Sequence, residues 1–571
     1  MKKQLFFVVS LMLTLVFSSC NKDLTPLNES NFKTTPNPLE VKGGKVDATI
    51  TGTFPVKYFA KNATVTVTPV LKLSDGTEIK GTPATYQGEK VVGNNTTVAY
   101  KAGGTYTMKT SFDYVPAMNK SELFLDFNVV TKKKTYTLPR IHVADGVMST
   151  ETLASKTFAA TGAEGSVYLN DKFQRVIQEM QEADILFLIQ QSNLRTSETK
   201  ASDIVDLTKK IKKVKETPNK QVSGLEILGY ASPDGSLDLN TNLAEKREKV
   251  TVDFINKELK KIKSTVKLDS KFTAEDWDGF QKLMESSNIQ DKQVILSVLN
   301  MYQDSEQRER EIKNLSAAFK TIADEILPQL RRSRLKLTVD VTGKSDVEIA
   351  NLAKTDAAKL TVEELLYAGT IATTVAEKAA VYQKAVELYP SDARSFNNLG
   401  AALYQQGNVA DAARYFAKGL EIEPKCPNLN YNAGLCALSQ GDLAKAEVFF
   451  GNAAGTKGNL SNALGTVSLI KGDYVKASTL FGKTATNNAA LAQILTGDYN
   501  AARNTLAAVA NPDALTAYLG AVVGARTNNR DAVFSNLRTA VGLDKSYGAK
   551  AKNDIEFAKF FTEETFKSIV G

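Results

Sequence analysis

The chain has 571 residues, of which 43% are hydrophobic and 23% charged, and its formal net charge is +8. Such a composition is typical of globular proteins and excludes long disordered regions. The length predicts about three to four domains of roughly 150 residues each. Lysines and acids are interleaved along the chain, and no arginine-rich block with spaced aromatics occurs. The sequence therefore indicates no nucleic-acid partner.

Residues 1–19 have the form of a signal peptide, with a basic start, an apolar run and two small residues before Cys20. The apolar run is shorter than the ~20 residues that a spanning helix needs. Small residues followed by a cysteine resemble a bacterial lipobox, which implies a lipoprotein with Cys20 as the lipidation site. An ordinary secretory signal with an incidental cysteine is the alternative. Acyl chains on Cys20 would make the lipid bilayer a partner, and residues 20–45 are expected to form a flexible tether.

Residues 46–150 alternate polar and apolar side chains in short runs, such as 65–68 and 123–127, with turn signals between them. Several short strands at this spacing predict an all-β, antiparallel, Ig-like sandwich. His142, the only histidine of the chain, lies in a strand-like run at the end of this region. It is expected to be structural, and the sequence predicts no metal site.

The most informative stretch is 225–250, in which an apolar strand ends at Gly229, a Pro-Asp-Gly turn follows, and a long helix begins. This arrangement resembles the motif of the OmpA-like (Pal-like) peptidoglycan-binding domain. The matching positions are Gly229, Gly235, Asn240, Leu243 and Arg247. The resemblance implies an α/β fold and a peptidoglycan ligand.

The elements around this motif are expected in the order β-α-β-α-β, followed by a last strand. The expected ranges are a strand at 184–189, a helix at 202–214, a strand ending at 229, a helix at about 241–261, and strands at 265–272 and 335–341. Helical periods over about 275–328 predict an insertion before the last strand. The OmpA-like domain is thus placed at 151–345.

Arg247 is the first candidate for ligand binding. At about 100° per residue it shares the inward stripe of its helix with Leu243, Val250 and Phe254. A partly buried guanidinium needs a carboxylate or several carbonyl acceptors. In the family, the equivalent arginine and a loop aspartate grip the carboxylate and amine of diaminopimelate in peptidoglycan stems. The alternative is that Arg247 pairs with an acid of its own domain, Asp234 or Asp238.

The position of the family's loop aspartate is Ser232 in this chain. Asp234 could reach the same space if the loop is reshaped, since Pro233 fixes the local φ. Binding retained through Asp234, weakened binding, and a domain kept for assembly all remain open. The peptidoglycan-binding candidates are Arg247, Asp234, Ser232 and Asn240.

Residues 361–571, after a linker at 346–360, resemble tetratricopeptide (TPR) repeats. Leu399, Gly400, Ala412, Phe416 and Pro424 fit the repeat pattern, and Gly434, Ala446 and Phe450 follow about 34 residues later. Five or six repeats are expected to stack into an all-α solenoid. The candidates for lining a protein-binding groove are Asn397, Gln405, Asn430 and Asn432, although each could equally be plain surface.

No catalytic residues are predicted, because the sequence contains no metal-ligand cluster, no Walker loop and no GxSxG motif. No cofactor is predicted either. Cys426 and Cys436 would lie about 15 Å apart along one helix, so they are expected to be buried packing residues rather than a disulfide.

Two functional hypotheses follow from these features. The first is an outer-membrane, periplasm-facing lipoprotein of a Gram-negative bacterium. It would be a non-catalytic cell-envelope scaffold that binds peptidoglycan through the OmpA-like domain and protein partners through the TPR repeats. The alternative is an accessory subunit of an outer-membrane secretion or surface-assembly complex, in which the OmpA-like domain docks protein rather than cell wall.

Overall fold

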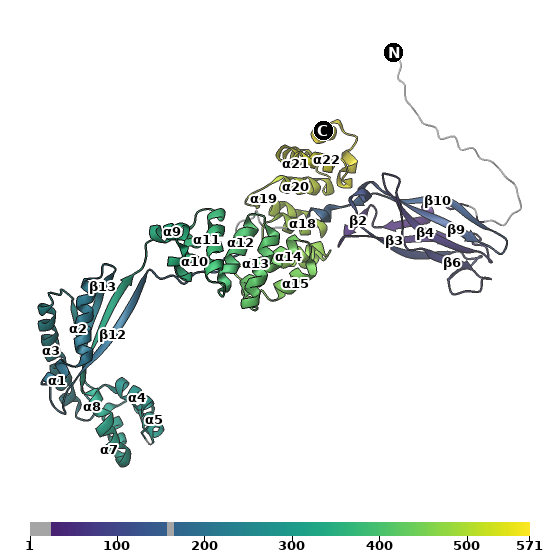
Figure 1. The fold of residues 1–571 in the computed structure, drawn as a ribbon. Helices are drawn as coiled ribbons and strands as arrows, with labels where there is room; N and C mark the ends of the chain where they lie inside the picture. The colour runs from purple at the N-terminus through teal and green to yellow at the C-terminus, as the bar shows by residue number, and fades with distance from the viewer. Residues whose placement is uncertain (1–23, 25, 157–164, 290) are drawn as a thin grey trace. The chain divides into compact units, whose positions relative to one another are not determined.

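The computed structural model describes residues 24, 26–156, 165–289 and 291–571 (Figure 1). The predicted signal peptide and Cys20 lie outside the described residues. The chain forms two compact units: residues 1–170 together with 372–571 make the first, and 171–371 make the second. The second unit is therefore inserted into the first. It begins at residue 171, whereas the predicted domain boundary is at 151.

The strands of the first unit form two sheets around one core. The first sheet contains β1 (Phe32–Thr35), β2 (Leu39–Lys42), β3 (Lys45–Phe54), β8 (Gly104–Asp113) and β11 (Val147–Met148). The second contains β4 (Thr64–Lys72), β5 (Glu78–Lys80), β6 (Ala84–Gly88), β7 (Thr96–Val98), β9 (Glu122–Val130) and β10 (Thr135–Asp145). Side chains alternate between buried and accessible along β3 and β9, and Ile50 and Phe127 from the two sheets share the core. This region is strand-rich, as the alternation predicts.

The predicted tether at 20–45 is wrong among its described residues, because Leu24 is already buried in the sandwich core. Strands β1 and β2 lie in it, and Leu39 and Val41 of β2 are buried in the sandwich core. The two prolines at 36 and 38 separate these short strands. Because each strand offers only one or two apolar side chains, their alternation is too short to show in the sequence.

The second unit has a four-stranded sheet in the order β12-β15-β13-β14. The strands are β12 (Val176–Leu186), β13 (Lys220–Tyr230), β14 (Leu268–Thr273) and β15 (Arg332–Thr342). Strands β13 and β14 are parallel, whereas β15 is antiparallel to both β12 and β13. Helices α2 (Ser202–Lys215) and α3 (Leu237–Lys261) bury apolar side chains against the sheet, and the short α1 (Thr196–Thr199) precedes α2. The predicted element order is present, but β12 begins eight residues earlier (184 − 176) than expected, and Leu188 and Ile189 lie in an exposed loop.

The helical insertion before β15 has a core of its own. Its helices are α4 (Trp277–Ser286), α5 (Lys292–Met301), α6 (Ser305–Asn314), α7 (Ser316–Glu325) and α8 (Leu327–Leu330). Phe280, Met284 and Ile295 are among its buried residues. The predicted linker at 346–360 is wrong, because α9 (Asp346–Thr355) fills most of it. A capping box between Ser345 and Glu348 begins α9, which packs against α10 (Val362–Ile371) in the second unit.

Residues 372–571 are helical and stack in pairs, as predicted for TPR repeats. The helices are α11 (Val375–Leu388), α12 (Ala393–Gln405), α13 (Val409–Ile422), α14 (Pro427–Ser439), α15 (Leu443–Gly451), α16 (Leu460–Ile470), α17 (Tyr474–Phe481), α18 (Asn487–Leu495), α19 (Tyr499–Ala507), α20 (Ala514–Arg526), α21 (Arg530–Leu543), α22 (Ser546–Ala551) and α23 (Glu564–Val570). A Cβ added at Gly400 would lie 2.6 Å from the Phe416 ring, and one added at Gly434 would lie 2.4 Å from Phe450. The small residue of each repeat is therefore needed for the aromatic of the same repeat to pack against its first helix.

Glu151 links the first sheet to the repeats within the first unit. Its carboxylate accepts hydrogen bonds from Gly43 N at 2.7 Å and Gly44 N at 3.1 Å, in the turn between β2 and β3. It also accepts from the hydroxyl of Tyr474 at the start of α17. The carboxylate is buried, but its three hydrogen bonds offset the free-energy cost of removing its charge from water.

Candidate functional site

The loop between β13 and α3 places the predicted ligand-binding residues at the end of a buried strand. A Cβ on Gly229 would lie 2.4 Å from Ala244 O, so only glycine lets α3 pack this closely on the strand. Asp234 N donates to Ser232 O at 2.9 Å and closes the turn. Ser236 then caps α3 by accepting from Leu239 N at 3.4 Å.

The Arg247 side chain is almost completely buried, with 1% of its surface exposed. Its guanidinium donates to three backbone carbonyls: Nε to Gln191 at 3.0 Å, Nη1 to Tyr230 at 2.9 Å and Nη2 to Leu188 at 3.3 Å. Within the described part of the chain, no carboxylate oxygen forms an ion pair with it. Burial, reinforced by the charge of Arg331, lowers the pKa of Arg247 to about 10, and the charge of Asp234 opposes this shift. The group stays protonated at neutral pH, as a buried cation whose hydrogen-bond acceptors are backbone carbonyls and whose guanidinium carbon lies 5.3 Å from the centroid of the Phe187 ring.

Asp234 pairs with Arg331, not with Arg247. Its Oδ2 accepts from Arg331 Nη2 at 3.0 Å, and its Oδ1 accepts from the Ser232 hydroxyl at 2.6 Å. Arg331 Nε also donates to Ser232 Oγ at 3.2 Å. The alternative in which Arg247 pairs with Asp234 or Asp238 is therefore wrong. Arg331 precedes the predicted last strand at 335–341, and nothing in the sequence indicates that it reaches this loop.

Asn240 has a structural role at the same loop. Its Nδ2 donates to Gly235 O at 3.0 Å and to Glu275 Oε1 at 2.9 Å, which ties the start of α3 to the loop that begins the insertion. A second buried pair, Arg332 Nη2 to Asp276 Oδ2 at 2.8 Å, lies beside it. The insertion is thus anchored where the ligand of an OmpA-like domain is expected.

A cavity of about 30 Å³ lies beside the Arg247 guanidinium. The residues lining it include Gln190, Ser232, Asp234, Asn240, Leu243 and Arg247, so it brings together all four predicted peptidoglycan-binding candidates. A polar cavity of this size holds one or two water molecules. An entering ligand must therefore displace part of the loop at 188–191 or at 231–236.

The predicted groove residues of the repeats contact a segment of the same chain, residues 166–169, which we call the strap. Asn432 accepts from Val167 N at 2.9 Å and donates to Val167 O at 2.8 Å. Asn397 also donates to Val167 O at 3.0 Å, and Gln405 accepts from the Tyr168 hydroxyl at 3.0 Å. Asn430 is placed differently, since its Nδ2 donates to the carbonyls of Pro424 and Cys426 just before α14 and not to the strap.

Two further asparagines that the sequence reasoning missed bind the backbone in the same way. Asn398 accepts from Leu169 N at 2.7 Å and donates to Leu169 O at 2.9 Å. Asn488 accepts from Ser155 N and donates to Ser155 O, both at 2.8 Å. The signal was available, because Asn398, Asn432 and Asn488 stand at the same distance before the inter-helix glycines 407, 441 and 497.

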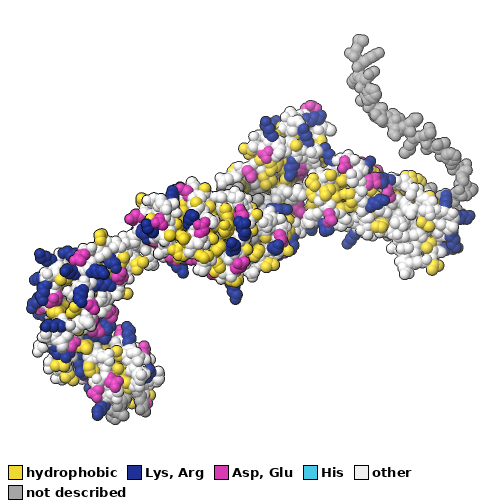
Figure 2. Space-filling model, viewed as in Figure 1, with side chains coloured by type: hydrophobic (Ala, Val, Ile, Leu, Met, Phe, Trp, Pro, Cys, Tyr) yellow, Lys and Arg dark blue, Asp and Glu magenta, His cyan; other side chains and the backbone are white. Residues whose placement is uncertain are grey.

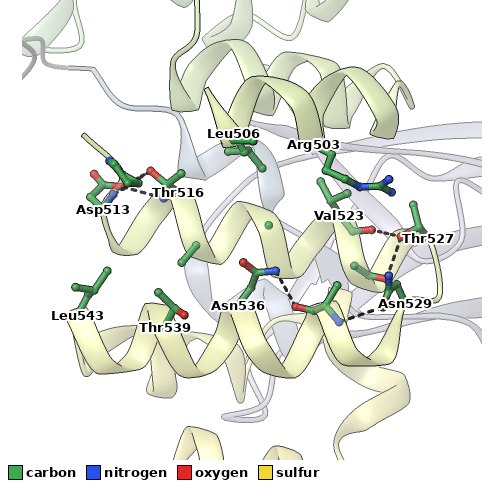
Figure 3. A pocket seen from close by; sticks show the side chains of 16 residues that line it. Arg503, Leu506, Asp513, Thr516, Val523, Thr527, Asn529, Asn536, Thr539 and Leu543 are labelled. Carbon is green, nitrogen blue, oxygen red and sulfur yellow. Dashed lines mark hydrogen bonds between the residues drawn. The ribbon is translucent and has the colours of Figure 1, made fainter. Parts of the chain in front are cut away.

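A larger cavity, of about 570 Å³, lies between α19 and α21 over the middle of α20 (Figure 3). Gly520 and Gly524 of α20 form part of its lining. Two of its polar residues cap helices: Asp513 accepts from Thr516 N at 2.8 Å and Asn529 from Ala532 N at 3.1 Å. The cavity is chiefly apolar and brings no acid–base pair together.

The antiparallel pairing of β9 and β10 places Glu122 opposite Asp145, beside His142. The donor atoms of these three side chains lie within 4.8 Å of one another, a spacing that a metal ion accepts. The expectation that no carboxylate clusters with His142 is therefore wrong. Asp145 lies three residues later in the sequence, and strand pairing adds Glu122 from β9. His142 Nε2 lies 2.9 Å from Asp145 Oδ1, which also accounts for the cluster as a histidine–carboxylate contact.

Cys426 and Cys436 are free and buried, as predicted. Burial raises the pKa of the Cys436 thiol to about 12, so it is not a thiolate at neutral pH. Among the described helices, none combines the length and the apolar character that crossing a bilayer requires.

Comparison with known proteins identifies one repeat: the tetratricopeptide repeat family matches residues 393–426. A search of curated proteins finds no match. Among solved structures, the Cut9–Hcn1 hetero-tetramer of APC/C matches with 14% identity and a TM-score of 0.31, over 40% of this chain and 46% of that chain, less than half of its length. A tetratricopeptide repeat protein from Parabacteroides merdae ATCC 43184 matches with 13% identity and a TM-score of 0.29, over 39% and 89% of the two chains. YrrB, described as a TPR protein with an unusual peptide-binding site, matches with 21% identity and a TM-score of 0.26, over 32% and 99%.

Proposed function

We propose that this protein is a non-catalytic scaffold of the cell envelope of a Gram-negative bacterium. An acylated Cys20 would hold it at the outer membrane, facing the periplasm. The second unit would bind peptidoglycan at the β13–α3 loop, and the TPR repeats would bind protein partners. The tetratricopeptide repeat at 393–426 supports the last part, since stacked repeats serve as protein-interaction surfaces.

The observation that carries the proposal is the buried charge of Arg247. Three carbonyls accept from three of its five N–H groups, and no carboxylate among the described residues forms an ion pair with it. A buried cation in this state gains most from an incoming carboxylate, because the low dielectric strengthens the attraction. The OmpA-like motif around Gly229, Gly235 and Arg247 supports diaminopimelate as the source of that carboxylate.

Exposed lysines on α2 and α3 support residence near an anionic polymer. On the face shown in Figure 2, Lys and Arg side chains gather over these helices. The exposed lysines are Lys209, Lys212, Lys213, Lys215, Lys246, Lys249, Lys257, Lys260 and Lys261. Their long-range field would raise the encounter rate with a negatively charged cell wall and would be screened by salt.

The second candidate function is an accessory subunit of a secretion or surface-assembly complex, in which this unit docks protein. The pairing of Asp234 with Arg331 favours it, because the acid that would meet the ligand's ammonium is already neutralised. The small cavity favours it as well. The two candidates differ in whether the unit binds cell wall.

Sedimentation of the full chain with purified sacculi tests the first candidate. We expect the wild-type chain to sediment and Arg247→Ala to lose at least about tenfold in affinity, which is the effect of one charge-assisted hydrogen bond of about 1.5–3 kcal/mol. The matched control is Arg334→Ala. Arg334 lies on β15, donates to Asp184 at 2.9 Å, and does not line the cavity beside Arg247. Replacing Arg334 should therefore leave binding unchanged.

Removal of Arg247 also takes away the side-chain donor to three carbonyls, of which Leu188 O keeps its bond from Gln191 N, so folding must be measured in parallel. Trp277, the only tryptophan of the chain, lies in the second unit, and its fluorescence reports the unfolding of that unit. A variant that stays folded at the assay temperature and no longer sediments supports the proposal. Absence of wild-type sedimentation rejects peptidoglycan binding and leaves the docking function.

A further inference from the structure

We propose that the strap is a resident pseudo-ligand of the TPR repeats, and that the protein partner is an extended peptide that must displace it. Asn397 and Asn398 on α12 and Asn432 on α14 bind the strap, and Asn488 on α18 binds Ser155 in the same way; we call these four residues the asparagine face. The inference rests on the proposed protein-binding function of the repeats, and it adds the kind of partner and a means of control.

The asparagine face recognises backbone rather than side chains. Asn398, Asn432 and Asn488 each use both amide atoms on the N–H and C=O of a single residue: Leu169, Val167 and Ser155 respectively. A side-chain amide that pairs with one residue in this way reproduces the hydrogen bonds of a neighbouring β-strand. Any extended peptide without proline at these positions can make the same bonds. The asparagine face therefore selects an extended backbone rather than particular side chains.

The spacing of these contacts explains why the bound chain must be extended. Asn398 and Asn432 occupy equivalent positions in successive repeats, and they hold Leu169 and Val167, which are two residues apart. The side chain of the intervening residue, Tyr168, also contacts the repeats, at Gln405 and Tyr382. The strap runs in the direction opposite to the order of the repeats: Val167 contacts α14, whereas the later residue Leu169 contacts the earlier helix α12.

Side-chain contacts then define the preferred sequence. The Tyr168 hydroxyl donates to Gln405 Oε1 at 3.0 Å, and its ring lies 5.9 Å from that of Tyr382. The Ser166 hydroxyl donates to Ala401 O at 3.0 Å. Val167, Tyr168 and Leu169 pack against the apolar core of the repeats while remaining partly accessible. The partner peptide should therefore carry a small polar residue, an apolar residue, an aromatic hydroxyl and an apolar residue in sequence.

The strap occupies the asparagine face through hydrogen bonds, and a free extended peptide can form the same bonds. Its advantage over a separate peptide is its covalent attachment, which gives an effective concentration in the millimolar range for short connections. Partners of ordinary affinity are therefore excluded until the strap is released, or until they supply additional contacts. The strap ends immediately before the second unit begins at Asp171, so its release also lengthens the connection to that unit.

The test uses a fluorescent peptide of residues 165–171, Gly-Ser-Val-Tyr-Leu-Asn-Asp, and fluorescence anisotropy with the full chain. We expect weak binding to the wild-type chain. The variant Val167→Pro with Tyr168→Ala removes the N–H that Asn432 accepts and the hydroxyl that Gln405 accepts. It should bind the peptide at least about tenfold more tightly. Asn170→Pro is the matched control, because the N–H of Asn170 meets no acceptor among the described residues and its loss should change nothing.

A third substitution locates the binding. Adding Asn432→Ala to the released variant should abolish the gain. Adding Asn430→Ala should preserve it, because the buried Asn430 amide donates to the carbonyls of Pro424 and Cys426 rather than to the strap. A released variant that binds the peptide no better than wild type overturns the proposal. So does a gain that survives Asn432→Ala.

Hydrogen exchange on the wild-type chain provides a readout that needs no variant. The amides of Val167 and Leu169 should exchange much faster than those in the middle of α14, because release of the strap does not require unfolding of the repeats. Equal protection of both sets would make the strap a permanent part of the core and overturn the proposal. The peptide assay contains no cell wall, so its failure is distinguishable from a failure of sacculus binding.

Discussion

At the scale of single residues, the question is which charges near the β13–α3 loop are already satisfied. Asp234, Arg331 and Ser232 form a closed set of hydrogen bonds, whereas the Arg247 side chain donates to backbone carbonyls and packs over the Phe187 ring without an ion pair. The sequence predicted the burial of Arg247 from its helical stripe. It did not predict the pairing of Asp234 with Arg331. Arg331 follows the helical insertion, and the two residues are 97 positions apart in the sequence.

Ser232→Asp tests whether the missing family acid limits ligand binding. The new carboxylate would replace the hydroxyl that now donates to Asp234 and accepts from Arg331. Arg331 would then be shared by Asp234 and the new aspartate, which leaves one of the two carboxylates free to bind an ammonium group. We expect the affinity for sacculi to increase by about tenfold, the effect of one additional charge-assisted bond. Ser286→Asp, which adds the same charge at an exposed position on α4, should leave the affinity unchanged. Weaker binding by Ser232→Asp would show that the serine is required.

At the scale of elements, packing between the helices of a repeat depends on glycine positions that the sequence identifies correctly. Gly400 and Gly434 lie against Phe416 and Phe450, as the repeat pattern predicts. The strap was missed for a physical reason: residues 166–169 form no helix or strand and have no periodicity of their own. Their extended conformation is imposed by asparagines more than two hundred residues away, with a separation of 265 between Val167 and Asn432.

Gly434→Ala should destabilise the repeats by about 1–3 kcal/mol, because the added methyl group overlaps the Phe450 ring and the helices must separate. The measurement is the denaturant midpoint of the helical circular dichroism signal. Gly451→Ala is the matched control. It lies at the exposed end of α15, with no atom within 4 Å of the added Cβ, and should be neutral or stabilise by up to about 1 kcal/mol. Equal effects of the two substitutions would mean that the glycine–aromatic contact does not set the spacing of the helices.

At the scale of the whole molecule, the second unit is inserted between the strap and the first repeat helix of the first unit. The predicted boundaries at 151 and 361 follow the order of the sequence and so place the strap in the wrong unit. Composition and periodicity report what each segment can form, but they do not report that distant segments fold together. Within the proposed scaffold, Cys20, the β13–α3 loop and the asparagine face would be three attachment points, for lipid, cell wall and protein.

The most direct test of the central claim is whether a carboxylate reaches the guanidinium of Arg247. The full chain, labelled at its arginines with ¹⁵N, would be titrated with meso-diaminopimelate, and the Nε–H resonance of Arg247 would be assigned by its loss in Arg247→Lys. We predict a saturable shift of this resonance, together with a smaller shift at Arg331. A resonance that stays fixed while the chain sediments with sacculi, or a shift confined to Arg331, would contradict the account.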